Sequence, residues 1–362
     1  MRWLRAASLL LGAACSRSGT EDRPSPARAS CDVKAVDRAL ALLRMGDGDG
    51  ARRSAAAARH CPASARGLAL QSALALDEGR IDDAIARARE ALALDARDPA
   101  VLLEAADALH ARRSFDEAAA LAERAARSSA GAARDDARLL VAEIRFEADM
   151  PARDVLETLP PAASLGVREA LRAGRLWLEL GEGARAEAYL RRAMRDRGKL
   201  STELRAELHY QMALCHDRAG RSAEKIAEFR QVWRLEHDAP PAGLHLARAG
   251  FESLVRDQIA VLPPDERRLL ERVTVSVAEY PAAEIVAEGF DPRSLGLFTG
   301  DADATGQRRP AVPGAIFLYQ ANLEAVARDE EDLRREVHRT LLHELGHFRG
   351  MSEEDLRAAR LQ

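Results

Sequence analysis

The chain has 362 residues, of which 47% are hydrophobic and 31% are charged, and its formal net charge is −4. This length is enough for two domains, and the composition is that of a folded globular protein rather than a disordered one. The 54 basic and 58 acidic residues are interspersed along the chain. No concentrated basic face is therefore expected, which argues against nucleic acid as a main partner.

Residues 1–15 have the pattern of a secretion signal. Two arginines are followed by a short, mainly apolar region of nine residues, which cannot span a bilayer core of about 20 helical residues. The small residues Gly12 to Ala14 before Cys15 resemble a bacterial lipobox, except that Gly12 stands where the lipobox usually has Leu. The resemblance implies that Cys15 carries lipid and becomes the mature N-terminus; ordinary signal cleavage nearby is the alternative.

Residues 16–30 form a polar stretch rich in Pro and Ser, which predicts a disordered tether. With the signal, this tether predicts an exported protein of the bacterial cell envelope, held on a membrane surface by its lipid, on the periplasmic face or at the cell surface. Because such a compartment is oxidising, we hypothesise a disulfide between Cys31 and Cys61, which flank a predicted helical hairpin. Cys215 lies on an apolar helical stripe and is predicted to be a core residue.

An internal repeat runs through residues 31–245. A small residue recurs with spacings of 33, 34, 34 and 34 residues, at Ala51, Ala84, Ala118, Ala152 and Ala186. Seven residues after each, a further apolar residue lies on the same helical face, at Ala58, Ala91, Ala125, Leu159 and Ala193. Stacked helix pairs need a small side chain at the same place in each unit, because the backbones approach one another there.

This pattern resembles a tetratricopeptide-repeat (TPR) array, most closely in residues 63–129. The adjacent prolines Pro160 and Pro161 make the fourth unit irregular, and a sixth helical pair at residues 204–235 has Lys225 near the small position. The resemblance implies an α-solenoid of helix-turn-helix repeats whose concave groove binds a peptide or protein partner. A generic Ala-rich helical bundle is the alternative.

Residues 246–362 predict a small α+β domain. Valines alternate with polar residues at 273–277, which is the period of a half-buried strand. Short apolar runs at 295–300 and 314–320 predict two more strands. A predicted helix precedes the strands, and residues 330–350, with apolar side chains at four-residue spacing, predict a final helix. The fold class expected for the whole chain is thus mostly α, a solenoid followed by this small domain.

The final predicted helix contains the motif His-Glu-Leu-Gly-His. His343 and His347 are four residues apart and therefore project from one face of a helix. This spacing can place two imidazole nitrogens about 2.0–2.1 Å from one Zn²⁺. Glu344 is turned aside, where it can act as a general base instead of binding the metal. Two surface or core histidines without a metal are the alternative.

A catalytic zinc needs a third protein ligand. Gly350 is the type of residue that most readily reverses the chain after a helix, and Glu353 follows six residues after His347. We therefore predict Glu353 as the third ligand, and Glu354 and Asp355 are neighbours that could take its place.

Residues 251–356, through this motif and the apolar runs before it, resemble the minimal zincin-like metallopeptidases known as minigluzincins. That family usually has Asp where this chain has Glu353. The resemblance implies a zinc peptidase-like fold that binds one Zn²⁺ and acts on a peptide or protein. Tyr319 and Tyr280 are candidate oxyanion stabilisers or core residues, and His338 is expected to be a surface residue or a neighbour of the ligands.

Together these features predict an exported, lipid-anchored zinc metallopeptidase in which Zn²⁺ is held by His343, His347 and Glu353, and Glu344 is catalytic. The TPR repeats would recruit the protein substrate or a partner. The alternative is a non-catalytic TPR scaffold or assembly lipoprotein with a structural zinc domain.

Overall fold

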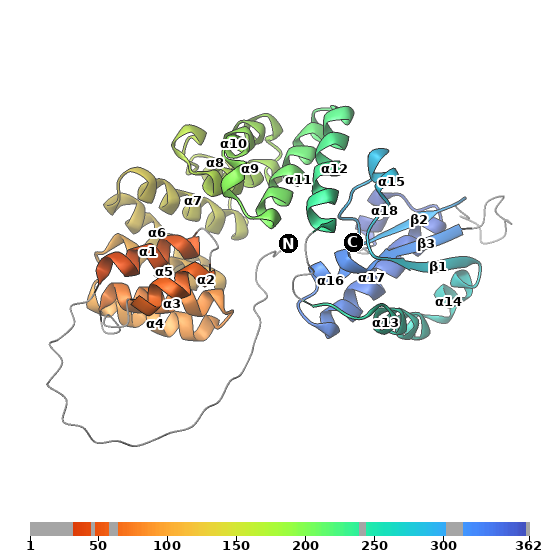
Figure 1. Cartoon of the computed structure of the whole chain (residues 1–362), viewed down its shortest axis with the longest axis horizontal. Coiled ribbons are helices and arrows are strands. Elements are labelled where there is room, and N and C mark those ends of the chain that lie inside the picture. The colour runs from red at the N-terminus through yellow and green to blue at the C-terminus, as the bar shows by residue number, and fades with distance from the viewer. Residues whose placement is uncertain (1–31, 45–47, 58–63, 239–243, 302–313, 360–362) are drawn as a thin grey trace, which may run out of the picture. The chain divides into compact units, whose positions relative to one another are not determined.

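The computed structural model describes residues 32–44, 48–57, 64–238, 244–301 and 314–359 (Figure 1). Cys15, Cys31 and Cys61 lie outside these ranges, so the lipid anchor, the tether and the disulfide stay predictions. The described residues divide into two compact units, one that ends at Leu200 and one that begins at Ser201. In these ranges, no helix is both long enough and apolar enough to cross a membrane.

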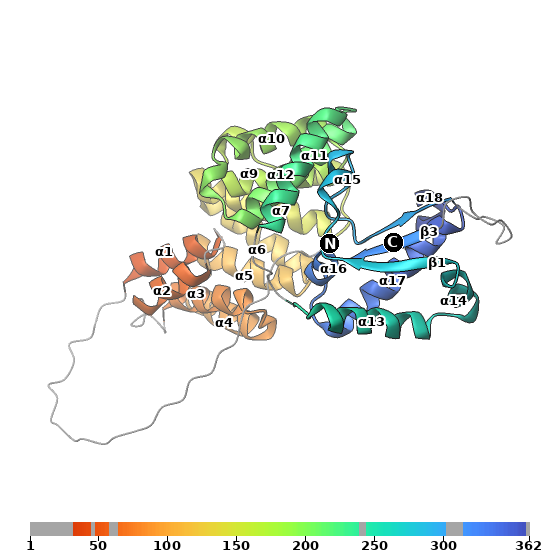
Figure 2. The same ribbon diagram turned by 45° about the vertical axis from the view of Figure 1, so that its right-hand side comes forward.

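The first unit is built from helices joined by short turns. Its elements are α1 (Val33–Arg44), α2 (Gly48–Ala57), α3 (Ala65–Asp77), α4 (Ile81–Leu94), α5 (Pro99–Ala111), α6 (Phe115–Ser128), α7 (Gly131–Glu147), α8 (Ala152–Leu156), η1 (Ala162–Ser164), α9 (Val167–Glu179), α10 (Gly183–Arg195) and η2 (Arg197–Lys199). Successive helices pack as pairs, α3 with α4, α5 with α6 and α9 with α10 (Figure 2). This is the predicted helix-turn-helix arrangement.

The repeated alanines lie where the helices of this unit pack together. Four of the five predicted positions are fully buried, namely Ala51, Ala84, Ala118 and Ala186. Of the second set, Ala91, Ala125, Leu159 and Ala193 are buried, and Ala58 lies outside the described residues. The prediction for Ala152 is wrong, because this residue is exposed. The helix α8 has only five residues, and its buried residue is Val155.

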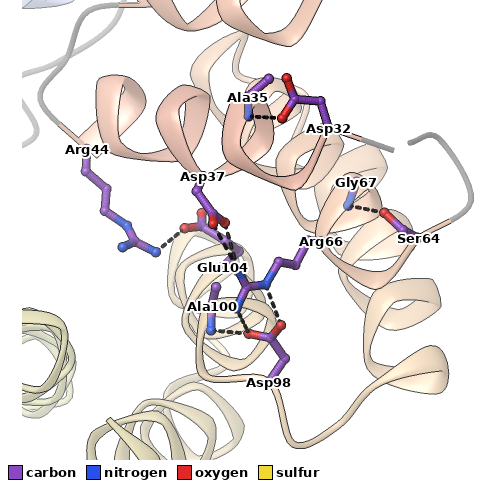
Figure 3. A network of polar contacts seen from close by, with 10 residues as sticks. All are labelled: Asp32, Ala35, Asp37, Arg44, Ser64, Arg66, Gly67, Asp98, Ala100 and Glu104. Carbon is purple, nitrogen blue, oxygen red and sulfur yellow. Dashed lines mark hydrogen bonds and ion pairs between the residues drawn. The ribbon is translucent and has the colours of Figure 1, made fainter. Parts of the chain in front are cut away.

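Arginine–carboxylate contacts join the helices of this unit (Figure 3). The Arg44 guanidinium at the end of α1 donates to Glu104 of α5 at 2.5 Å. Arg66 of α3 donates to Asp37 of α1 at 2.8 Å and to Asp98 at 2.6 Å. Asp98 also caps α5, because its side chain accepts from the Ala100 N–H. The Asp98 carboxylate thus caps the start of α5 and, through Arg66, joins α3 to α5.

The second unit combines a helical pair with a small sheet. Its elements are α11 (Thr202–Arg218), α12 (Ser222–His237), α13 (Arg248–Val261), α14 (Pro264–Leu270), β1 (Val273–Ala278), α15 (Ala283–Ala287), β2 (Gly296–Thr299), β3 (Gly314–Tyr319), α16 (Gln320–Val326), α17 (Glu330–Phe348) and α18 (Glu353–Ala358). The three predicted strands are all present, and the helix predicted at 330–350 is α17. Cys215 is 2% exposed in α11, which confirms it as a core residue.

The sheet has the strand order β1-β3-β2, and β2 is an edge strand. Strand β1 runs parallel to β3, whereas β2 runs antiparallel to it. Helices α13 and α17 pack against the sheet and share one apolar core with it. Leu333, Val337, Leu341 and Leu345 form the buried stripe of α17 in this core. Burying that stripe orients the opposite face of α17, which carries the histidines, away from the core.

Candidate metal centre

The motif histidines lie in the last turns of α17, the helix whose Thr340 and Glu344 lie against the edge strand β2. The helix begins at the cap residue Asp329, whose side chain accepts from the Asp332 N–H. It ends before Gly350, which has a φ of 82° that glycine adopts without strain. His343 and His347 keep 21% and 27% of their side-chain surface exposed. Both can therefore reach a ligand that arrives from solvent.

The chain reversal after α17 brings Glu353 to the two histidines. Their Nε2 atoms are 3.1 Å apart, and Glu353 Oε1 lies 3.1 Å from His347 Nε2 and 3.7 Å from His343 Nε2. These three residues form a group with the donor atoms that a metal ion needs. The alternative ligand Asp355 is engaged elsewhere, because its carboxylate accepts from the N–H and the hydroxyl of Ser352 at the start of α18.

The spacing of the three donor atoms fits a tetrahedral zinc site. Bonds of about 2.0–2.1 Å at tetrahedral angles place two ligand atoms about 3.3 Å apart. The three observed separations, 3.1, 3.1 and 3.7 Å, lie on either side of that value. Two imidazoles and one carboxylate also form the donor set of a catalytic zinc site that leaves a fourth position open. The residues present therefore fit a zinc ion.

His347 has a second contact that orients its ring. Its Nδ1 lies 3.2 Å from the carbonyl oxygen of Met351, in the turn between α17 and α18. A carbonyl can only accept, so Nδ1 carries the proton and Nε2 presents its lone pair towards His343 and Glu353. A backbone acceptor of this kind fixes the tautomer of a metal-binding histidine. The sequence pattern His-Glu-x-x-His does not predict this contact with Met351, because the acceptor is a main-chain atom.

Glu344 is placed apart from the three donor atoms. It is 5% exposed and lies against β2, where a Cβ added to Gly296 would approach its Oε1 to 2.9 Å. The Phe298 backbone N–H is also near the carboxylate. Burial raises the pKa of Glu344 to about 7 because it disfavours the charged form, although a positive charge on His343 and the Phe298 N–H act in the opposite direction.

The two candidate tyrosines differ in their surroundings. Tyr319, at the end of β3, is 3% exposed. It lies inside the protein near Glu344, and burial and that negative charge raise its pKa to about 12. Tyr280 donates to the carbonyl oxygen of Glu236 in α12 at 3.4 Å. His338 is half-buried and is not part of the donor group.

Comparison with known proteins identifies the class of the C-terminal region. Residues 270–361 match the family model described as zincin-like metallopeptidase. A comparison with curated proteins found no match. The C-terminal region is therefore zincin-like, which indicates a metallopeptidase and implies a zinc cofactor.

Two solved structures are similar to the helical region at low identity. One is pilF of Pseudomonas aeruginosa, with 17% identity and a TM-score of 0.41 over 57% of this chain and 92% of that one. The other is a thermophilic TPR protein of Thermus thermophilus, with 17% identity and a TM-score of 0.28 over the same shares. The period and the paired helices define the array of this chain as TPR-like, a fold that indicates protein interaction. The chain thus joins TPR-like helical pairs to a zincin-like domain.

Proposed function

We propose that this protein is an exported, lipid-anchored zinc metallopeptidase that hydrolyses peptide bonds and uses its TPR-like array to recruit the substrate or a partner. The observation that carries the proposal is the meeting of His343, His347 and Glu353 next to a buried Glu344 that does not join them. A zinc that only stabilises a fold needs no proton acceptor beside its ligands. The position of Glu344 therefore favours catalysis.

In this proposal His343, His347 and Glu353 hold the metal through Nε2, Nε2 and Oε1. Zinc, when bound, supplies a Lewis acid that lowers the pKa of a water and polarises a carbonyl group. The Glu344 carboxylate accepts a proton from the attacking water and returns it to the nitrogen of the leaving amine. Glu344 is buried beside the proposed ligands, where its carboxylate can carry out both transfers.

The edge strand β2 is proposed as the surface on which an extended substrate lies. Of the described strands, only β3 is hydrogen-bonded to β2, so no described strand pairs with the other edge of β2, along which a peptide main chain would add. Gly296 of β2 lies against the Glu344 carboxylate. A peptide added along this edge would therefore present its scissile bond next to the proton acceptor.

The experiment that tests the proposal measures zinc and peptide cleavage in the same preparations. We expect about one zinc per chain in the wild type and in Glu344→Gln, and little in His347→Ala. Glu344→Gln should lower cleavage of a peptide library by about 10²–10⁴-fold, the range for loss of a general base. Glu331→Gln, on the exposed start of α17, is the control. A Glu344→Gln protein that cleaves as fast as the wild type would refute the peptidase function.

The anchoring part of the proposal is supported by the pattern of residues 1–15 and is tested separately. Mass analysis of the protein extracted from membranes should find a lipid on the N-terminal Cys15, and Cys15→Ser should release the protein from the membrane fraction. A mature protein that begins at another residue and carries no lipid would contradict this part alone.

One observation favours the second candidate, a scaffold lipoprotein with a structural zinc. Glu344 is buried against Gly296 of β2, so it also has a role in the packing of β2 on α17. This reading expects Glu344→Gln to change thermal stability but not function, and it expects no cleavage by the wild type. The measurement of zinc together with cleavage separates the two candidates.

A further inference from the structure

The segment between β1 and β2 receives its apolar support from the helical pair α11–α12. Val286, the buried residue of α15, is 0% exposed. It lies in a cluster with Ala213 of α11 and Phe229 of α12, against which Tyr210 and Trp233 pack. This cluster is separate from the core that α17 shares with the sheet. The pair therefore supplies the core of this segment.

Polar contacts fix the same segment to the helical pair at both of its ends. At the start, the Trp233 indole N–H donates to the Pro281 carbonyl oxygen at 2.8 Å. At the far end, the Tyr210 hydroxyl donates to the Asp291 carboxylate at 2.8 Å. Both donors belong to α11 or α12, and both acceptors belong to the segment.

Arg293 is the strongest of these links. Its guanidinium donates to Glu207 of α11 at 2.6 Å and to Glu236 of α12 at 2.9 and 2.7 Å. It also lies over the Tyr210 ring, 4.3 Å from the centroid. With 25% of its side chain exposed, Arg293 neutralises two half-buried carboxylates at once. Removing it would leave those carboxylates uncompensated, which is costly in a partly buried site.

The chain is held from a second side where it enters β2. The Asn322 amide of α16 donates to the carbonyl oxygens of Pro292 at 2.8 Å and Ser294 at 2.7 Å. The Tyr319 N–H donates to the Leu295 carbonyl oxygen at 3.0 Å. Arg293 thus lies three residues before Gly296, in a stretch fixed between the helical pair and α16. Arg293 is therefore close enough in the chain to affect the position of the start of β2.

We propose that the helical pair α11–α12 is part of the peptidase unit, and that Arg293 is a positioning residue for the edge strand β2. Through β2, Arg293 positions Gly296, which lies against the Glu344 carboxylate. The pair lies outside the residues that match the zincin-like family, and it belongs to the same compact unit as the metal centre. The catalytic unit of this chain therefore begins at Ser201. The effect of Arg293 on peptide cleavage rests on the proposed function, whereas its support of β2 does not.

The test compares full-length Arg293→Ala and Arg293→Lys with wild type by hydrogen exchange of the β2 amides. We expect exchange at residues 296–299 to rise by about tenfold or more in Arg293→Ala, because β2 loses its support on one side. Arg293→Lys, which keeps the charge, should restore part of the protection. Arg268→Ala, an exposed arginine of α14, is the matched control and should leave β2 unchanged.

Zinc content and kinetics in the same variants separate this inference from the proposed function. Arg293→Ala should keep its zinc, and where cleavage is measurable its KM should rise more than its kcat falls. Should Arg293→Ala not fold, Tyr210→Phe tests the same link through its lost hydrogen bond to Asp291. Unchanged β2 exchange in the folded variants would overturn the inference. Faster exchange in a protein without peptidase activity would support it and refute only the proposed function.

Discussion

Gly346 of α17 and Leu356 of α18 meet at a point that leaves no room for another side chain. A Cβ added to Gly346 would lie 2.4 Å from Leu356 Cδ2 and 3.3 Å from Met351 Sδ. Leu356 is fully buried by this contact. The glycine inside the metal motif therefore allows α18 to pack on α17, and α18 begins with Glu353. The position of the third predicted ligand depends on the absence of a side chain at Gly346.

The first prediction follows from that contact. Gly346→Ala should force α18 away from α17 and move Glu353, so that zinc affinity falls by about 10–100-fold, the usual range for changes that disturb ligand orientation. Competition with a chromophoric chelator measures the affinity. The matched control is Gly198→Ala, where an added Cβ meets nothing within 4 Å. Unchanged zinc affinity in Gly346→Ala would show that α18 does not set the ligand position.

The second prediction concerns which carboxylate binds the metal. Glu353→Ala should lose zinc affinity, because a site with two histidines lacks the third ligand that zinc requires. Glu353→Asp should bind more tightly than Glu353→Ala and more weakly than the wild type, since α18 is placed for the longer side chain.

The neighbouring acids provide the controls for this experiment. Asp355→Asn should keep its zinc and lower the stability of α18 slightly, because Asp355 forms the capping box of α18 with Ser352. Glu354→Gln should keep its zinc and its stability. Loss of zinc in either control, with zinc retained in Glu353→Ala, would transfer the ligand role to that neighbour.

Features that depend on the spacing of nearby residues could be predicted from the sequence. The four-residue apolar spacing of α17, the alternation of β1 and the recurring alanines each follow from the geometry of a single element. The meeting of His343, His347 and Glu353 belongs to the same class, because one helix and one glycine turn bring them together.

Features that depend on contacts between distant segments could not be predicted in this way. The burial of Glu344 against β2 requires a strand some 50 residues earlier in the chain to lie beside α17. The dependence of α15 on α11 and α12 is likewise invisible to local periodicity. The 34-residue period failed at Ala152, where the short α8 replaces a full helix and buries Val155 instead.

The third prediction concerns the space that β2 leaves for the proton acceptor. In Gly296→Ala the added Cβ would meet Glu344 Oε1 at 2.9 Å and Thr340 Cγ2 at 2.8 Å. We expect zinc to be retained and cleavage to fall by about tenfold or more, because misplacing a catalytic group by about 1 Å is costly. Gly250→Ala, in the open part of α13, is the control. An equal loss of peptide cleavage in Gly296→Ala and Gly250→Ala would contradict this prediction, because it would indicate general destabilisation.

The last prediction concerns the stability of the helical array as a function of pH. Burial and the nearby Glu104 raise the pKa of Asp107 to about 8, although Arg172 and Arg44 oppose this shift. Arg44 also contacts Asp136 at 3.6 Å, and Arg172 pairs with Glu143, so both arginines are shared among several acids. Asp107 therefore holds its proton more tightly in the folded chain than in the unfolded one.

The sign of the pH dependence follows from this difference. Below about pH 4 Asp107 is protonated in both states, so its contribution to the free energy of unfolding is fully present there. Between about pH 4 and pH 8 the folded chain binds more protons than the unfolded one, and this contribution is lost as the pH rises through the folded pKa. Asp107→Asn, which carries no charge at any pH, should remove this component. It should be more stable than wild type at pH 8 by about 1–2 kcal/mol, since solvent reaches part of Asp107 and screens its charge. Urea unfolding at pH 5, 6.5 and 8 measures the difference in the free energy of unfolding between the two proteins. Asp116→Asn is the exposed control. A difference that does not grow with pH would show that Asp107 is ionised in the folded array.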